Sequence, residues 1–119
     1  MIAAAVLVAA APSASPAQRP PERTGECRIL RGRAFLSNGT PSVRLWVIGT
    51  TRILGVHQQD LSFDDLPSAL RQAWTTDGRP DWGKRIYGRF TVCALEPSRP
   101  GRMQEVRIVA AGDLRVRRY

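Results

Sequence analysis

Apolar and polar residues alternate along most of the chain after residue 26, in short runs bounded by Gly, Pro, Asn and Ser. A period of two is typical of strands that bury one face, and the spacing of the runs indicates a small β domain. The pattern predicts five strands, at 27–36, 42–48, 51–56, 86–95 and 103–110.

The first three predicted strands are joined by two turns. Asn38-Gly39 is a strong hairpin signal, because both residues tolerate positive φ, and Gly49-Thr50 fits a two-residue turn. The second turn places Leu45 opposite Leu54, so that the apolar faces coincide. Gly32, in the middle of the first strand, suggests a bulge or a sharp bend. The inward residues are expected to be Val43, Leu45, Val47, Leu54 and Val56.

A helix is predicted at 66–74, where the apolar residues follow the spacing of one buried stripe. Asp64 and Asp65 stand where an N-cap and the helix dipole favour anions. Residues 75–85 are expected to form a loop, and Ala111–Asp113 a turn that ends the fifth strand. The segment that follows, 114–116, is expected to be a short extra strand or a frayed tail.

The predicted order of three strands, one helix and two strands resembles that of the OB-fold, a five-stranded Greek-key barrel. The predicted class is therefore all-β with one short helix, and a small open meander or sandwich is the alternative. Residues 27–119 are expected to form this single domain.

The N-terminus differs from the rest of the chain. Residues 2–11 form an unbroken apolar run that is too short to span a bilayer and typical of a signal peptide. Small residues at 15–17 favour cleavage before Gln18, with Ala9–Ala11 as a second candidate. We therefore expect a signal peptide at 1–17 and a disordered Pro-rich leader at 18–26. The alternative for the apolar run is a disordered Ala/Pro tail.

The two cysteines, Cys27 and Cys93, form an even pair in a chain expected to be exported, which indicates a disulfide. An OB-like order pairs strand one with strand four and brings these residues together. Close spacing typical of zinc or thiol-redox sites is absent from the sequence, and no metal or other cofactor is expected.

The net charge is +8, and Lys84 is the only lysine among the 18 basic residues. Arginine suits phosphate, sulfate and carboxylate ligands, because its guanidinium donates parallel hydrogen bonds. Codon bias is the alternative explanation, since Ala, Gly and Pro are abundant as well. The predicted partner is therefore an anionic ligand, either a nucleic acid or an acidic glycan, or alternatively a protein.

OB-folds bind ligands across strands two and three, between the loops that join strands one to two and four to five. On this face the sequence places a Trp among arginines, which is the composition of a stacking platform with anion contacts. The alternative is that the Trp packs beneath a loop and an Arg stem covers it. The predicted ligand-binding residues are Arg44, Trp46, Arg52, Arg99 and Arg102.

A second candidate patch lies within 74–90, where aromatic and basic residues are interleaved. The alternative is that Trp74 and Phe90 fill the core while the charges solvate a loop. The interleaved residues are Trp82, Tyr87 and Phe90 with Arg79, Lys84, Arg85 and Arg89.

Catalysis has little support in the sequence. The single histidine, His57, could pair with Asp60, Asp64 or a serine, but no nucleophile elbow, phosphate-binding glycine loop or two-histidine motif accompanies it. We expect a non-enzymatic protein, and a small hydrolase that uses His57 is the third hypothesis. A module that acts through strand edges or oligomerisation is the second.

The runs GRAFLSNGTPSVRLWVIGTTRILGV and GRFTVCALEPSRPGRMQEV resemble a group of small, uncharacterised exported proteins of Gram-negative bacteria. The resemblance covers most of the segment after the expected signal peptide. It implies one domain and a periplasmic or secreted location, and it carries no activity.

Overall fold

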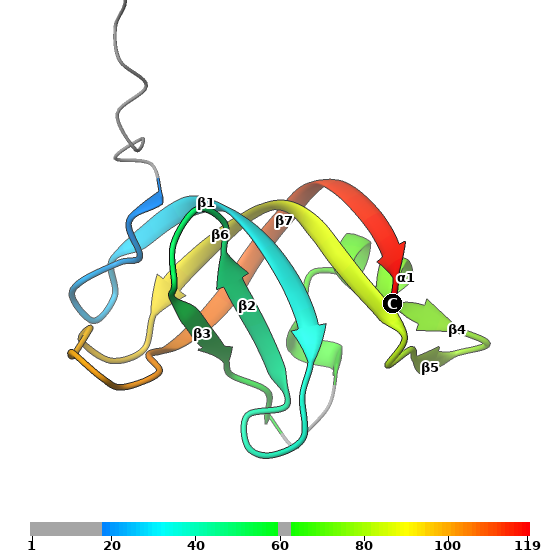
Figure 1. The fold of residues 1–119 in the computed structure, drawn as a ribbon, viewed down its shortest axis with the longest axis horizontal. Coiled ribbons are helices and arrows are strands. Elements are labelled where there is room, and N and C mark those ends of the chain that lie inside the picture. The colour runs from blue at the N-terminus through cyan, green and yellow to red at the C-terminus, as the bar shows by residue number, and fades with distance from the viewer. Residues whose placement is uncertain (1–17, 60–62) are drawn as a thin grey trace, which may run out of the picture.

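The computed structural model describes residues 18–59 and 63–119, and within them the protein is mostly β with one α-helix (Figure 1). The predicted signal peptide, 1–17, lies outside the described residues. No helix within the described ranges is long and apolar enough to cross a membrane. The elements are β1 (Cys27–Leu36), β2 (Val43–Val47), β3 (Ile53–Val56), the 3-10 turn η3 (Phe63–Asp65), α1 (Ser68–Trp74), β4 (Thr75–Thr76), β5 (Arg79–Pro80), β6 (Lys84–Ala94) and β7 (Glu105–Arg118).

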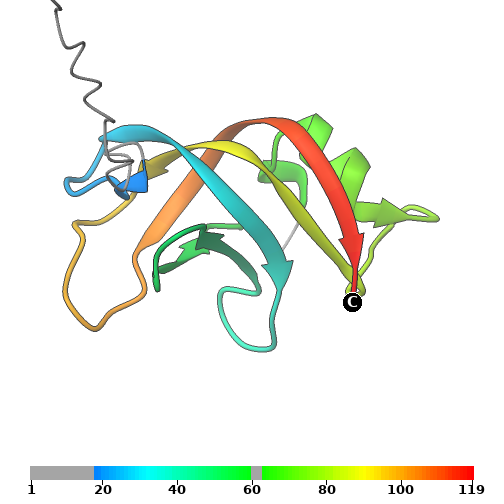
Figure 2. The same ribbon diagram turned by 45° about the horizontal axis from the view of Figure 1, so that its top comes forward.

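Five of these strands form one mixed sheet in the order β1-β2-β3-β7-β6. All neighbours are antiparallel except β3 and β7, which run parallel. β6 pairs in turn with β1, so the sheet closes on itself as a barrel. In Figures 1 and 2, β1, β6 and β7 form a long arch, with α1 and the small β4–β5 hairpin near the C-terminal end of β7. This hairpin lies in the segment 75–85, which was expected to be a loop.

The register of β2 and β3 confirms the predicted pairing, because Leu45 lies opposite Leu54 and Arg44 opposite Gly55. The turn between them is wider than two residues, since β2 ends at Val47 and β3 begins at Ile53. All five residues predicted to face inward are buried. The core is completed by side chains from the other strands and from α1, including Leu30, Ile86, Phe90, Val92, Val106, Ile108, Leu70 and Trp74.

Gly32 does not mark a bulge, because β1 pairs in regular register with both β2 and β6 around it. A Cβ at this position would lie 2.6 Å from Leu45 Cδ1. The glycine therefore lets the neighbouring core side chain approach the backbone of β1.

α1 begins at Ser68, two residues later than predicted, and Pro67 occupies the N-cap without a side-chain hydrogen bond. The prediction that Asp64 and Asp65 cap this helix is wrong, because both lie in the preceding turn η3. A Pro before the first helical residue disfavours helical backbone at the residue that precedes it, so the chain forms a separate turn there.

The turn predicted at Ala111–Asp113 is also wrong, because β7 continues through it to Arg118. The β6–β7 register shifts between Tyr87 and Arg89, and Asp113 adopts φ of 52°. A bulge accommodates an extra residue and a turn-like φ without ending the strand. The β6–β7 ladder consequently extends through the Arg-rich C-terminal segment.

Residues 18–26 were expected to lie outside the fold, but this segment is fastened to the barrel. The Gln18 amide accepts a hydrogen bond from the Arg31 N–H and donates to the carbonyls of Arg31 and Ile48, each at 2.9 Å. Pro21 is buried, and its carbonyl accepts from Gln104 Nε2 at 2.8 Å. The segment is therefore part of the domain.

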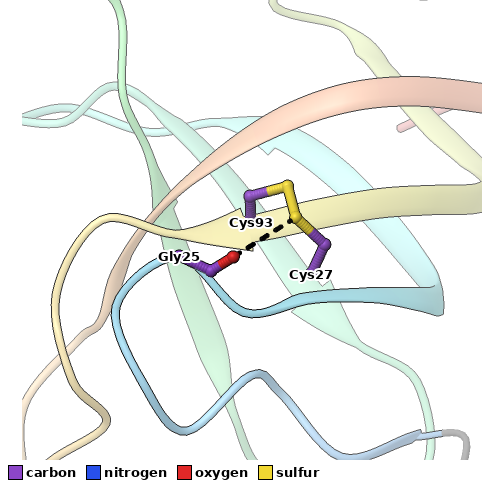
Figure 3. Close-up of a disulfide and its surroundings, with 3 residues drawn as sticks. All are labelled: Gly25, Cys27 and Cys93. Atoms are coloured by element: carbon purple, nitrogen blue, oxygen red, sulfur yellow. Dashed lines mark hydrogen bonds between the residues drawn. A yellow bond between two sulfur atoms is a disulfide. The ribbon is translucent and has the colours of Figure 1, made fainter.

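The predicted disulfide between Cys27 and Cys93 is confirmed (Figure 3). The two residues are direct partners in the β1–β6 ladder, with their Cα atoms 4.0 Å apart. The bond joins positions 66 residues apart in the sequence, and the Gly25 carbonyl oxygen lies 3.7 Å from Cys27 Sγ. It fastens the first strand to the strand that closes the barrel.

Candidate functional site

The five predicted ligand-binding residues do not line one common cavity. Arg99 and Arg102 line a small depression of about 130 Å³ in the β6–β7 loop. Arg52 reaches the same loop, where its guanidinium donates to the Ser98 hydroxyl at 3.0 Å. Arg44 instead donates to the Pro41 carbonyl at 3.2 Å, within the loop between β1 and β2.

Trp46 is half-buried and already has partners. Its Nε1 donates to the Thr50 carbonyl at 2.7 Å, and the Arg33 guanidinium lies 5.0 Å from its ring centroid. The residue that covers the ring is therefore Arg33, not Arg44. Trp46 forms part of a stacked cluster and not a bare ring.

A cavity of about 410 Å³ does lie between the two loops that flank the β2–β3 face, but none of the five predicted residues lines it. The cavity contains the carboxylates of Glu96 and Glu105. A Cβ on Gly55 would lie 2.7 Å from Pro41 Cγ and 3.4 Å from Met103 Cε, so these side chains lie close over the strand. This arrangement disfavours an anionic ligand on the predicted face.

His57 lies at the edge of the same cavity. Its Nδ1 is 2.6 Å from Oε1 of Glu105, a carboxylate that was not among the partners considered from the sequence. The hydroxyl of Ser42 donates to Gln58 Oε1 at 3.0 Å. Asp60, one of the considered partners, lies outside the described residues.

The largest concentration of positive charge occurs elsewhere, in a cleft of about 820 Å³ on the outer face of β1, β6 and β7. We call it the arginine cleft. Its basic residues come from all three strands, and Tyr87 lies among them. The arginines that line it are Arg31, Arg85, Arg89, Arg115, Arg117 and Arg118.

The strand register brings several of these arginines directly opposite one another. Arg31 pairs with Arg89 across β1 and β6, and Arg85 pairs with Arg117 across β6 and β7. Residues in such positions project from the same face of the sheet, and like charges there are destabilising. The cleft therefore contains two like-charge pairs that an anion could neutralise.

Few carboxylates compensate this charge. Among the described residues, Asp113 Oδ2 lies 3.7 Å from Arg89 Nε, and Asp81 Oδ2 lies 3.0 Å from an Arg118 nitrogen. The first pair is solvent-exposed, so its contribution to stability is small. The Gly83 N–H, the Thr76 hydroxyl and the Arg118 guanidinium lower the pKa of Asp81. Asp81 therefore remains ionised at neutral pH and holds the end of β7.

Between the two like-charge pairs runs a row in which aromatic and basic side chains alternate. Trp46 lies opposite Arg33, Arg33 opposite Tyr87, and Tyr87 opposite Arg115. The Arg33 guanidinium also lies 5.3 Å from the Phe35 ring centroid. The Arg33 guanidinium therefore lies over both the Phe35 and the Trp46 ring on the outer face of the barrel.

A second stacked pair lies at the C-terminal end of the cleft, where the Arg85 guanidinium is 4.0 Å from the Tyr119 ring centroid. The Nε atoms of Arg85 and Arg33 are buried and have no hydrogen-bond partner among the described residues. Guanidinium groups held against rings in this way present a flat cationic face.

The bulge in the β6–β7 ladder shapes the floor of the cleft. A Cβ on Gly88 would lie 2.6 Å from Leu114 Cδ2 and 2.8 Å from the Gly112 carbonyl oxygen. Only a glycine allows β7 to come this close. The bulge also shifts the register of the arginines on β7 relative to β6.

Of the second sequence-predicted patch, Arg85, Tyr87 and Arg89 line the cleft. Trp74 and Phe90 are core residues, and Lys84 Nζ donates to the carbonyls of Ala73 and Thr75. The arginines of β1 and of the C-terminal segment belong to neither patch predicted from the sequence. The alternation of side chains along the strands could have indicated that these arginines face outward. Arg31 and Arg33 alternate with inward residues of β1, and Arg115 and Arg117 alternate with Leu114 and Val116.

Within 18–59 and 63–119 no group of three or more His, Cys, Asp or Glu side chains is placed to hold a metal ion. Comparison of the chain with protein-family models, with curated proteins and with solved structures gave no match.

Proposed function

We propose that this chain is an exported, non-enzymatic, OB-like β-barrel that binds an anionic ligand in the arginine cleft. The strand order β1-β2-β3-β7-β6, with the helix between β3 and β6, supports the OB-like assignment. The ligand site in this proposal is not the face that OB-folds commonly use, because the arginines gather on β1, β6 and β7.

Export to the periplasm or the medium rests on two features. The apolar run at 2–11 has the length and composition of a signal peptide. The Cys27–Cys93 disulfide is of a kind that persists in oxidising compartments and is rare in reducing ones.

The observation that supports the proposed ligand is the presence of two cross-strand arginine pairs, Arg31 opposite Arg89 and Arg85 opposite Arg117. Each such contact costs roughly 0.2–1 kcal/mol of stability in the empty protein. An anion that accepts hydrogen bonds from both members of a pair removes this repulsion and gains charge-assisted contacts. Codon bias explains a high arginine content, but it does not explain why six arginines line one cleft.

The test is the change in melting temperature caused by inorganic tripolyphosphate, a compact polyanion, at about 50 mM and about 200 mM salt. We expect stabilisation of roughly 5 °C at the lower salt concentration and much less at the higher one. The Arg31→Gln/Arg89→Gln double variant should lose most of the effect.

The matched control is the Arg99→Gln/Arg102→Gln double variant, which removes the same charge from the sequence-predicted site. It should retain the stabilisation by tripolyphosphate. Equal losses in the two double variants, or no stabilisation of the unmodified protein, would contradict the proposed site.

A second candidate function, association through a strand edge, is supported by the short contact between β3 and β7. These strands pair only at Gly55–Glu105 and Val56–Val106, so the remainder of β7 has no β3 partner. Another chain could add a strand there, although arginines along β7 are of the kind that discourages edge pairing. Light scattering, which measures the molar mass in solution, tests self-association. A stable dimer would support this candidate, and a monomer would contradict self-association through this edge.

A further inference from the structure

We infer that the ligand of the arginine cleft is a single-stranded nucleic acid whose bases stack on Tyr87 in the cleft and on the arginine–aromatic groups beside it. The inference rests on the proposed function, since it names the class of anion that the cleft takes. Three features of the molecule support it: the stacked groups, the position of Tyr87 and the spacing of the charged rows.

The stacked groups distinguish a nucleic acid from a sulfated or carboxylated glycan. Arg33 lies beside the cleft, opposite Tyr87, with its Cζ 5.3 Å from the Phe35 ring centroid and 5.0 Å from the Trp46 ring centroid. Arg85 is held 4.0 Å from the Tyr119 ring centroid. Bases exposed in a single strand stack on aromatic rings and on guanidinium planes, whereas the sugar rings of an acidic glycan have no π-system and pack on such groups only through their C–H bonds.

Tyr87 supplies a ring between the two like-charge pairs. It is half-buried, lines the cleft and lies directly between Arg33 and Arg115 in the register of the sheet. A base that stacks on this ring would carry its phosphates toward arginines on either side. The alternation of one ring with two cations is typical of platforms that bind single strands without sequence preference.

The charged rows run in the direction that a strand of nucleic acid would take. Arg89, Tyr87 and Arg85 alternate along β6, so successive rows are about 6.7 Å apart. A linear polyanion lying along β6 would therefore meet the Arg31–Arg89 pair, the Tyr87 row and the Arg85–Arg117 pair in turn. A duplex keeps its bases stacked within the helix and could use the charges but not the platforms.

The experiment uses the disulfide-bonded protein and an oligodeoxythymidylate of about 15 nucleotides, followed by fluorescence anisotropy. Arg118 is paired with Asp81, which leaves Arg31, Arg85, Arg89, Arg115 and Arg117 for phosphates. With five such contacts, a plot of the logarithm of the binding constant against the logarithm of salt concentration should have a slope of about −3.5. Each Arg→Gln change in the cleft should reduce the magnitude of this slope by about 0.7.

The stacking claim is tested by Tyr87→Ala, which should weaken oligodeoxythymidylate binding by roughly tenfold, while Tyr87→Phe retains it. Heparin, a sulfated glycan, serves as the second probe. Its affinity should be nearly the same for Tyr87→Ala and for the unmodified protein, and this also verifies that the variant is folded.

The outcomes separate the two proposals. If heparin and the oligonucleotide bind with the same salt slope and Tyr87→Ala weakens neither, the cleft is a general polyanion site and the nucleic-acid inference is wrong. If neither probe binds at low salt, the proposed function itself fails. Duplex DNA that binds as tightly as the single strand would also contradict the stacking claim.

Discussion

Removal of the Cys27–Cys93 disulfide should destabilise the protein strongly without altering its fold. The bond closes a loop with a sequence separation of 66. In the chain-entropy model a loop of this length stabilises the folded state by about 4 kcal/mol, through its restriction of the unfolded chain. A domain of about 100 residues commonly has a total stability of roughly 5–15 kcal/mol, so this loss is a large part of it.

The folded state should lose little when both cysteines become serine. Cys27 is exposed and Cys93 is half-buried, so the substitutions leave no large cavity in the core. The β1–β6 ladder also continues from the Cys27–Cys93 pair as far as Ala34 opposite Ile86, and its hydrogen bonds do not depend on the sulfur atoms.

The assay is equilibrium unfolding in urea, with the oxidised protein, the reduced protein and the Cys27→Ser/Cys93→Ser variant compared side by side. With a denaturant slope of roughly 1.5 kcal/mol per M, the midpoint should fall by about 2–3 M in both disulfide-free forms. The slope should rise slightly, because the unfolded chain without the cross-link is less compact. A loss of less than about 1 kcal/mol would refute the argument that restriction of the unfolded chain dominates.

Three further changes test the packing and electrostatics. Gly88→Ala should cost roughly 1–3 kcal/mol in urea unfolding, because its Cβ would collide with Leu114, whereas Gly112→Ala, which meets open space, should be nearly neutral; equal costs would contradict this account. Gln104→Leu should cost roughly 2–3 kcal/mol, because two carbonyls lose the donor that joins the N-terminal segment to the β6–β7 loop, and an unchanged urea midpoint would refute that role. Asp81 has a lowered pKa in the folded state, so its contribution to stability is present above its ordinary pKa of 3.8 and is lost as pH falls through the folded value. Asp81→Asn should therefore be less stable than the unmodified protein at pH 6, with the difference shrinking as pH falls below 3.8, and a difference that is the same at neutral and acid pH would contradict this assignment.

The sequence was sufficient for those parts of the fold that depend on local alternation. The pairing of Leu45 with Leu54 follows from two apolar faces that coincide in only one register. The disulfide followed from an even cysteine pair combined with an element order that brings the first and fourth long strands together. In the first case only one strand register buries both apolar faces, and in the second each cysteine has only one possible partner.

The end of β7 could not be predicted in the same way. Ala111-Gly112-Asp113 has the composition of a turn, but the partner strand β6 is long enough to continue the ladder. Tertiary pairing therefore converted a turn signal into a bulge. The N-terminal segment was misjudged for a similar reason, because its contacts, such as Gln104 with Pro21, join residues far apart in the sequence.

The proposed ligand site differs from the one predicted from the sequence, because its position depends on which faces of three strands lie side by side. Arg44 and Trp46 do project outward, as their parity indicated, but Trp46 stacks with Arg33 and Arg44 bonds to a loop carbonyl. The arginines of β1 and β7 converge only because β6 lies between them, which no property of the separate runs reveals.

The most direct test of the central claim is a map of arginine side-chain NMR signals during titration with tripolyphosphate. We predict that the Nε–H resonances of Arg31, Arg85, Arg89, Arg115 and Arg117 shift together, with one saturation curve. Shifts confined to Arg44, Arg52, Arg99 and Arg102 would place the ligand on the β2–β3 face and contradict the assignment of the site to the arginine cleft.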